Sequence, residues 1–365
     1  MSELQRATYL LTGATGFLGR HVLDALLHQH PSAQILVLVR KAAEWADICA
    51  QYHADGCADL ARVAVVEGGI LGDDAWLRDP RLRNVEKIFH LAALVRHSRR
   101  KPQDIYDTNI EGTLRMVRLA GRLNLEHGPS KKPVRMVYVS TSGTVGCSTS
   151  PDAAPDEDAP YCENRVASWP YYDSKVQAEK KARGLAAELG VQLIVVRPPV
   201  LLGPGDFRYR STGTVIKFLQ QKFPFLLQGG MHFIDIRDAA AAIVRAMHHP
   251  AARPVYHLAG TASTLTEFFQ MLHDVSGVPL PKRTLPTPIA LALAQAAERS
   301  SDLLGRKKSP LPVPVVVEMG SHYWGLRSRF AKGELDYESR PGRQTLADTV
   351  RWLRDHHPDL QKVRK

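Results

Sequence analysis

The stretch that decides the fold is Leu10-Leu11-Thr12-Gly13-Ala14-Thr15-Gly16-Phe17-Leu18-Gly19. A short apolar run, typical of a buried β-strand, leads into a turn marked by three glycines, and the apolar positions that follow recur with helical spacing. The first two glycines permit a tight turn and close approach of a ligand, and Gly19 permits close packing of helix on strand. A diphosphate held there would face free N–H groups at the positive end of the helix dipole. The stretch therefore predicts a dinucleotide site, with contacts from Thr12, Gly13, Thr15, Gly16, Phe17, Leu18 and Gly19.

The end of the second expected strand indicates which dinucleotide binds. Arg40 follows Val39 about 20 residues beyond the glycine turn, where NAD enzymes usually carry an acid that holds the ribose 2′-hydroxyl. An arginine cannot accept that proton, but its planar fork can bind a 2′-phosphate, so NADP is favoured over NAD. Further along the chain, cofactor contacts are expected from Ile70 after the third strand and from Leu91, Ala92 and Ala93 after the fourth.

The wider pattern predicts a doubly wound parallel sheet. Short β-rich runs at residues 8–11, 35–39, 63–66, 87–91, 134–140 and 192–197 alternate with helical patterns. Prolines and glycines at 198–205 then break the alternation. We expect an α/β Rossmann domain over residues 1–200, to which 232–260 return, and a smaller, mostly helical substrate-binding cap over 201–231 and 261–365.

Two features of the expected cap are specific. Residues 305–314 are basic and rich in proline, which prevents helix continuation, so we expect a loop over the site. The helical pattern at 289–304 is expected to supply an apolar cap through Ile289, Leu291, Leu293, Leu303 and Leu304.

A second group of residues indicates proton transfer. The fifth strand ends in three hydroxyls, Ser140-Thr141-Ser142, and Tyr171 and Lys175 follow at a spacing that puts them on one helix face. A tyrosine with a pKa near ~10 is a poor base, but a neighbouring cation stabilises the phenolate and lowers that pKa. The tyrosine can then exchange a proton with a carbonyl oxygen or an alcohol. Tyrosine and lysine often share a helix face by chance, and the glycine turn and hydroxyl strand are what favour catalysis here.

Together these motifs resemble the short-chain dehydrogenase/reductase superfamily in its extended form, over nearly the whole chain. The resemblance rests on the glycine turn, His90–Ala93, Asn109–Thr113, Ser140–Ser142, Tyr171–Lys175, Arg197-Pro198-Pro199 and Phe233–Asp238. It implies that Thr141 is the catalytic hydroxyl, with Ser142 in reserve, and that Lys175 also holds the nicotinamide ribose. It further implies that Asn109 shapes the helix and a water chain near Lys175, and that Pro198 and Val200 contact the nicotinamide.

Within the superfamily the chain is most similar to the dihydroflavonol 4-reductase and 3β-hydroxysteroid dehydrogenase group, and its first 40 residues are also similar to thioester-reducing domains. Two departures stand out. Gly68-Gly69 replaces the usual Gly-Asp near adenine, and Ser142-Gly143 lacks the acidic pair of sugar-nucleotide dehydratases, which disfavours elimination chemistry.

Composition limits the partners. The 365 residues carry 48 Lys and Arg against 37 Asp and Glu, a net charge of +11, which favours anionic ligands such as dinucleotides, coenzyme A, acidic carrier proteins or membrane head groups. The basic run at 306–308 could touch a membrane, but three cations are fewer than the 4–8 expected for lipid recognition. Cysteine spacing signals neither disulfides nor a metal site, and no transmembrane segment or nucleic-acid partner is expected. We expect a cytoplasmic monomer or homodimer.

The leading hypothesis is an NADP-dependent oxidoreductase that reversibly reduces a ketone or aldehyde of a hydrophobic flavonoid-, steroid- or acyl-like substrate. Hydride would come from the nicotinamide and the proton from Tyr171. Two alternatives stay open: a nucleotide-sugar epimerase with tightly bound NAD, and a non-catalytic protein that senses dinucleotides.

Overall fold

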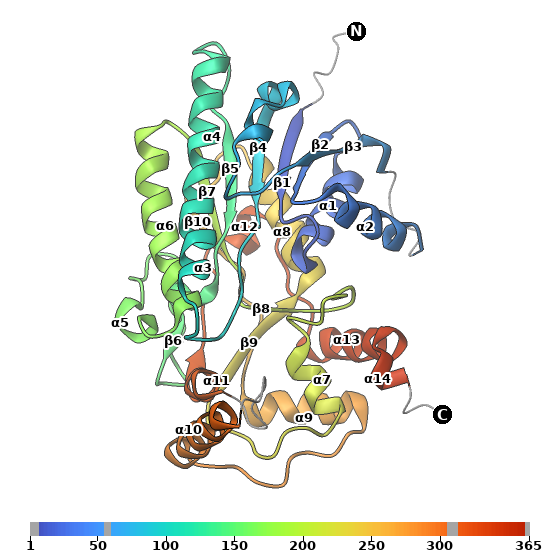
Figure 1. Ribbon diagram of the computed structural model, residues 1–365, viewed down its shortest axis with the longest axis vertical. Coiled ribbons are helices and arrows are strands. Elements are labelled where there is room, and N and C mark those ends of the chain that lie inside the picture. Colours follow the sequence, from blue (N-terminus) through green and yellow to red (C-terminus); the bar gives the residue numbers. More distant parts are fainter. Residues whose placement is uncertain (1–6, 55–59, 305–312, 362–365) are drawn as a thin grey trace.

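A computed structural model of the chain describes residues 7–54, 60–304 and 313–361, and shows two lobes one above the other (Figure 1). The upper lobe is built on a seven-stranded sheet in the order β10-β7-β5-β4-β1-β2-β3, in which every neighbouring pair is parallel. Its strands are β1 (Thr8–Thr12), β2 (Gln34–Val39), β3 (Val63–Glu67), β4 (Val85–His90), β5 (Arg135–Val139), β7 (Gln192–Arg197) and β10 (Val255–His257). All carboxyl ends therefore meet at one edge, which faces the lower lobe.

Helices cover both faces of this sheet, which confirms the predicted doubly wound fold. One face packs against α1 (Phe17–Gln29), α2 (Ala42–Ala54) and α8 (Ile236–His248), and the other against α4 (Gly112–His127) and α6 (Pro170–Glu188). In α1 the apolar residues Val22, Leu23, Leu26 and Leu27 are all buried, as their helical spacing requires. Short elements complete this lobe: α3 (Gln103–Tyr106), α5 (Glu163–Val166), η1 (Leu60–Arg62), η2 (Ala75–Arg78), η3 (Pro80–Asn84), η4 (Asp107–Glu111) and η5 (Ser142–Thr144).

The lower lobe has its own core. A three-stranded sheet of β8 (Val200–Leu202), β9 (Gly230–Asp235) and β11 (Thr261–Thr264) packs with α7 (Gly213–Leu219), α9 (Leu265–Ser276), α13 (Gly342–His356) and α14 (Pro358–Gln361). A small sheet of β6 (Cys147–Ser148) and β12 (Tyr323–Trp324) links the two lobes. The remaining helices are α10 (Thr287–Leu303), α11 (Pro314–Gly320) and α12 (Ala331–Glu334).

The structure corrects two expectations about the second half of the chain, one for the segment 233–236 and one for the apolar cap. The segment 233–236 does not return to the main sheet: β9 pairs with β8 and β11, because the chain leaves β7 through two prolines, which lack the N–H that a central ladder needs. Only β10 joins the main sheet, while α8 packs on α1. Most of the loop expected at 305–314 lies outside the described residues, and Pro314 begins α11. Four of the five expected apolar cap residues, Ile289, Leu293, Leu303 and Leu304, are exposed.

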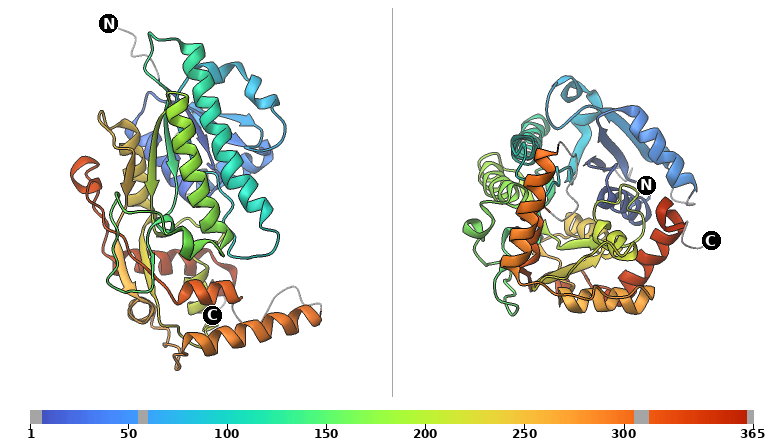
Figure 2. Two further views of the ribbon diagram at one scale, coloured as in Figure 1. Left: turned by 90° about the vertical axis from the view of Figure 1, so that its left-hand side faces the viewer. Right: turned by 60° about the horizontal axis from the view of Figure 1, so that its bottom comes forward.

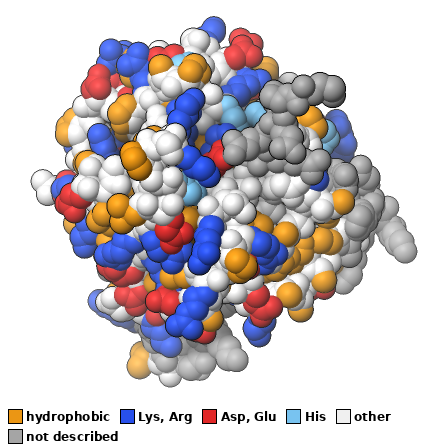
Figure 3. All heavy atoms as spheres, turned by 90° about the horizontal axis from the view of Figure 1, so that it is seen from above, with side chains coloured by type: hydrophobic (Ala, Val, Ile, Leu, Met, Phe, Trp, Pro, Cys, Tyr) orange, Lys and Arg blue, Asp and Glu red, His pale blue; other side chains and the backbone are white. Residues whose placement is uncertain are grey.

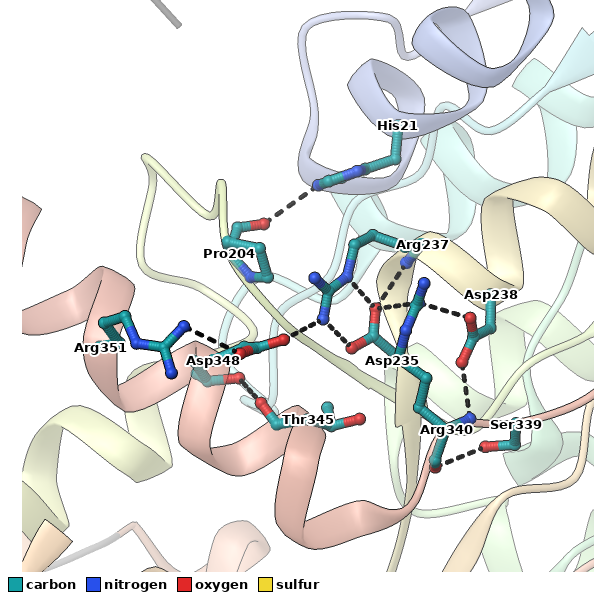
Figure 4. A network of polar contacts seen from close by, with 11 residues as sticks. His21, Pro204, Asp235, Arg237, Asp238, Ser339, Arg340, Thr345, Asp348 and Arg351 are labelled. Carbon is teal, nitrogen blue, oxygen red and sulfur yellow. Dashed lines mark hydrogen bonds and ion pairs between the residues drawn. The ribbon is translucent and has the colours of Figure 1, made fainter. Parts of the chain in front are cut away.

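An ionic network fastens the lower lobe to the upper one just below the carboxyl edge (Figure 4). Asp235, fully buried at the end of β9, accepts hydrogen bonds from Arg237 and forms an ion pair with Arg340. Arg237 also reaches Asp348 of α13, at 2.6 Å. Nearby, the ring of His21 in α1 lies 3.0 Å from the carbonyl oxygen of Pro204. The His21 contact joins the glycine-turn helix to the loop after β8, and the ion pairs join β9 and α8 to α13. The division into a cofactor domain and a substrate cap at the boundaries given above stays a prediction.

The surface seen from above, over the amino ends of the strands, mixes Lys and Arg with Asp and Glu and shows no single field of positive charge (Figure 3). Among the helices of the described part of the chain, none is long and apolar enough to cross a membrane.

Candidate active site

The glycine turn lies at the carboxyl end of β1, where the fold requires it. Gly13 has φ +78°, and a side chain there would collide with the backbone of the 91–92 segment, 2.8 Å from the nitrogen of Ala92. A side chain at Gly19 would overlap the carbonyl oxygen of Gly13. Both positions thus exclude any residue larger than glycine, the first for conformation and both for space. The predicted contact residues Leu91 and Ala92 are brought directly against this turn.

The start of α1 is suited to a diphosphate. Gly16 is the N-cap residue, no side chain caps the helix, and the first turn contains no acid. The first N–H groups of a helix have no partner within it and carry partial positive charge. Phe17 and Leu18 are the first two residues of the helix, and Leu18 is partly buried against the core between α1 and the main sheet. The turn therefore fits the diphosphate of a dinucleotide, as expected from the sequence.

A chain of hydrogen bonds behind the turn positions it. Thr12 Oγ1 lies 2.8 Å from Nδ1 of His90 and accepts a bond from the backbone N–H of Ala92. His90 Nε2 lies 3.1 Å from Oγ1 of Thr113, which in turn donates to the carbonyl oxygen of Asn109. Because burial lowers the pKa of His90 to about 3, the ring is neutral, with one nitrogen donating and the other accepting. His90 was not among the predicted site residues, although a histidine that ends a buried strand is a signal.

Asn109 connects two segments that meet at the site. It lies in the π-helical turn η4, its Oδ1 accepts from the N–H of Leu94, and its Nδ2 donates to Leu94 O and to Ser174 Oγ. Ser174 lies between Tyr171 and Lys175 in α6 and itself donates to the carbonyl oxygen of Tyr171. Asn109 therefore fixes the first turns of α6 relative to the segment after β4.

Thr141, Tyr171 and Lys175 come together at the carboxyl edge. Thr141 follows β5 as the N-cap of η5, where its Oγ1 accepts from the N–H of Gly143. Its hydroxyl lies beside the partly buried phenol of Tyr171 and acts to lower the pKa of that phenol. Lys175 is almost fully buried, and its Nζ donates to the carbonyl oxygen of Val139 at 2.8 Å and lies 4.3 Å from the ring centroid of Tyr138. The reserve hydroxyl, Ser142, is buried, and its N–H donates to Pro198 O.

The protonation of this group differs from the expectation. Burial raises the pKa of Tyr171 to about 12, and only the Thr141 hydrogen bond opposes the rise. Burial also lowers the pKa of Lys175 to about 7, against the attraction of Glu179. In this structure Lys175 does not lower the pKa of Tyr171, because its amine is turned to Val139 and Tyr138. Tyr171 is therefore a neutral phenol near pH 7, the form that can donate a proton.

A buried ion pair that sequence reasoning missed lies one helical turn beyond Lys175. Arg197 ends β7 and contacts both carboxylate oxygens of Glu179, with neither side chain appreciably exposed. Tyr161 donates to Glu179 at 2.9 Å, and His257 lies 3.1 Å from Arg197. The pair joins α6 to β7 behind the site.

Aromatic rings surround Tyr171 on its other side. The ring of Tyr172 lies 5.0 Å from that of Tyr171 and stacks on Trp324 of β12 at 4.8 Å. His97, in the segment after β4, meets the Tyr171 ring edge-on at 5.5 Å, and its buried Nδ1 has no hydrogen-bond partner among the described residues. This aromatic cluster was not predicted, because its members come from segments more than 200 residues apart.

The remaining predicted cofactor residues lie around the same edge, with different surroundings. Arg40 follows β2, is 73% exposed and pairs with Glu44 at 3.5 Å. Ile70 follows β3 and packs against the core on the α4 side of the main sheet, in the space that Gly112 leaves free. Val200 lies in β8 and is partly exposed, and Thr15 and Ala93 are partly buried.

Comparisons with known proteins agree with this geometry. The family model described as the NAD dependent epimerase/dehydratase family matches residues 9–259. A putative dihydroflavonol 4-reductase from Synechocystis is 27% identical over 354 residues, covering 95% of both chains. Sterol demethylase protein B from Methylococcus capsulatus is also 27% identical, covering 95% of this chain and 98% of its own. The solved structure of gox2253 covers 96% of this chain and 99% of its own, with a TM-score of 0.76 and 25% identity. The chain therefore belongs to the NAD dependent epimerase/dehydratase family, the extended short-chain dehydrogenases/reductases, and is an NAD(P)-dependent enzyme of that type.

Proposed function

We propose that the protein is an NADP-dependent reductase that reversibly converts a ketone or aldehyde on a hydrophobic substrate into an alcohol. The observation that carries the proposal is the partly buried phenol of Tyr171, beside the hydroxyl of Thr141 at the same sheet edge as the glycine turn. The similarity of the chain to a putative dihydroflavonol 4-reductase supports the same reaction class.

Tyr171 is suited to the reducing direction. A pKa of about 12 keeps the phenol protonated at neutral pH, so it can transfer a proton to a carbonyl oxygen as negative charge develops there. The Thr141 hydroxyl lies beside the phenol and can orient the same substrate oxygen. Bound NADPH would supply the hydride. For the reverse reaction Tyr171 must first lose its proton, which favours alkaline conditions.

Lys175 and Asn109 act on this arrangement indirectly. The amine of Lys175 is anchored to Val139 O beneath the site, within one helical turn of Tyr171, where it can hold the ribose of the nicotinamide. Asn109, through Ser174, fixes the turn that carries both residues. The pair is thus placed before any substrate binds, which lowers the entropic barrier to reaction.

The surroundings of Tyr171 support an apolar substrate. Tyr172 stacks on Trp324 beside it, and Trp169 contacts both rings, edge-on and tilted. Such aromatic rings are favourable partners for apolar groups. The residues after Thr141, Ser142 and Gly143, provide no acid, which argues against dehydratase chemistry.

The proposal is tested by following NADPH oxidation with panels of ketones, aldehydes and acyl thioesters, and then replacing Tyr171 by Phe. We expect the Tyr171→Phe variant to lose about 10²–10⁴-fold in kcat while NADPH binding, measured by fluorescence, is unchanged. Full activity of this variant would disprove the role of Tyr171. Tightly held NAD in the purified protein would favour the epimerase, and the absence of turnover with every compound would favour a dinucleotide sensor.

The preference for NADP rests on Arg40 and has its own test. Since a charge-assisted hydrogen bond contributes about 1.5–3 kcal/mol, Arg40→Asp should lower the ratio of kcat/KM for NADPH to that for NADH by about 10–100-fold. The matched control is Arg351→Asp, because Arg351 is similarly exposed (72%) and pairs with an acid on its own helix, at 3.3 Å. An unchanged ratio in Arg40→Asp would remove the basis for NADP.

A further inference from the structure

His97, in the segment between β4 and α3, lies beside the candidate catalytic tyrosine with a hydrogen-bonding atom unused. Its ring meets that of Tyr171 edge-on, with the centroids 5.5 Å apart, and stacks on that of Tyr172 at 5.9 Å. The residue as a whole is partly exposed, but its Nδ1 is buried and has no hydrogen-bond partner among the described residues. A buried polar atom without a partner carries a free-energy cost, so its position beside the active site requires a reason.

Two other buried histidines near the carboxyl edge show how the chain holds an imidazole that has a structural role. Both ring nitrogens of His90 lie within 3.1 Å of a threonine hydroxyl. Both ring nitrogens of His257 lie 3.1 Å from a group of an arginine, one a guanidinium and the other a backbone carbonyl. The chain thus satisfies these two rings completely and leaves Nδ1 of His97 unsatisfied.

The segment that carries His97 is fixed on both sides of it. Asn109 bonds both the N–H and the carbonyl oxygen of Leu94. Arg99 donates to both carboxylate oxygens of Glu318 in α11, which lies below the lower end of α6 (Figure 2). His97 is therefore held in place before a substrate binds, and a group held in this way loses little entropy when it takes a ligand.

The protonation of His97 indicates which chemical group it can bind. Burial lowers the pKa of His97, so the ring is neutral near pH 7. A neutral imidazole has one nitrogen that donates and one that accepts. A hydroxyl group can pair with either nitrogen, since it both donates and accepts, whereas a carbonyl oxygen can pair only with the N–H. A carboxylate would be attracted to a charged ring, which His97 is not. The best partner is therefore a hydroxyl.

We propose that His97 determines substrate specificity: its imidazole hydrogen-bonds a hydroxyl group of the substrate that lies close to the carbonyl reduced at Tyr171. The 5.5 Å between the two rings brings both within reach of one small part of a substrate. The stacked rings of Tyr172 and Trp324 contact the apolar remainder. The inference rests on the proposed function and narrows its substrate class to hydroxylated ketones or aldehydes with an apolar body.

Two ketones of nearly equal shape test this inference. α-Hydroxyacetophenone and propiophenone differ only in a hydroxyl or a methyl group at the same position beside the carbonyl. For each ketone, kcat/KM is measured with NADPH, and Kd is measured by calorimetry on the protein loaded with NADP⁺, where no turnover occurs. We expect the unchanged chain to favour the hydroxyketone by about tenfold in both quantities, and the His97→Phe variant to lose this preference.

The matched control is a histidine of the same aromatic group whose nitrogen is already bonded. His322 lies 5.1 Å from the ring of Trp169, and its Nδ1 lies 2.8 Å from the carbonyl oxygen of Glu318. His322→Phe should keep the preference for the hydroxyketone. His97→Asn, which retains a polar atom near the position of Nδ1, should keep part of it.

A role in recognition also has a signature in stability. His97→Phe removes the unpartnered nitrogen and keeps the ring contacts, so we expect the unfolding temperature of the substrate-free protein to rise by about 2–4 °C. A residue with a structural role would lower it.

Equal preference in His97→Phe and the unchanged chain, or no preference in the unchanged chain, would overturn the proposal. So would a loss by the same factor on both ketones, since His97 would then serve the reaction in general. Full activity of Tyr171→Phe would instead overturn the proposed function. The two failures are distinguishable, because the ratio of the two Kd values does not depend on turnover.

Discussion

Helices α6 and α10 break the usual rule of burial in opposite directions. Helix α6 buries Ser174, Lys175 and Glu179 inside the protein, whereas α10 leaves Ile289, Leu293 and Leu303 outside. Buried charge and aligned exposed apolar residues both carry a free-energy cost unless a partner removes it. In α6 the partners belong to the chain itself, Val139, Arg197 and Asn109. In α10 no described residue covers these apolar side chains, so the comparison separates an internal site from an exposed apolar helix face.

The largest expected effect concerns the buried ion pair of α6. Arg197→Met leaves the charge of Glu179 in the interior without its ion-pair partner, with the Tyr161 hydroxyl still donating to it, so we expect a loss of about 3–5 kcal/mol in the free energy of unfolding. Urea denaturation measures the loss.

A double variant shows whether the two charges act as a unit. Glu179→Leu combined with Arg197→Met removes both, and should recover most of the stability that Arg197→Met loses. If the double variant is less stable than Arg197→Met, the unpaired charge is not the cause, and the packing of the two long side chains is.

A smaller effect is expected from Lys175, as a dependence on pH. Burial lowers its pKa to about 7 in the folded chain, below its usual value near ~10.4 in an unfolded one. Between these values the unfolded chain binds more protons than the folded one, so stability should rise by about 1 kcal/mol per pH unit above pH 7. Below pH 7 both states are protonated, and stability should stay at its lowest value. Unfolding curves of the cofactor-free protein from pH 6 to 9 measure the rise.

The matched variants for this pH dependence lie on the same helix. Lys175→Met should be more stable than the unchanged chain at pH 7 and should lose most of the rise. Lys181→Met, at an exposed position of α6, should keep it. A rise that survives in Lys175→Met would place its origin in other groups.

The same two helices show how far sequence reasoning reaches. The spacing of Tyr171 and Lys175, read after a glycine turn and a strand ending in hydroxyls, predicts a position near Thr141. The structure brings these residues to the same carboxyl edge, because strand, turn and helix patterns are local. The Glu179–Arg197 pair and the contact of His97 with Tyr171 join distant segments of the chain. The hydrophobic periodicity of a sequence contains no information on such contacts.

In α10 the pattern is apolar on both sides, since alanines alternate with leucines. Only the packing of Phe225 and Val317 against Ala290 and Ala294 determines which side is inward. The pairing of β9 with β8, rather than with the main sheet, was missed for the same reason.

The smallest expected effect is on the stability of α10, and it sharpens the comparison most. Because Leu293 is 44% exposed and lies outside the cluster that Ala290 and Ala294 form with Phe225, Leu293→Lys should change the free energy of unfolding by no more than about 0.5 kcal/mol. One position along the helix, Ala294→Leu adds volume to a filled contact with Phe225 and should cost about 1–3 kcal/mol. Thermal or urea unfolding of the two variants side by side measures both. A large loss in Leu293→Lys would mean that this residue packs within the chain, and the contrast between α10 and α6 would then not hold.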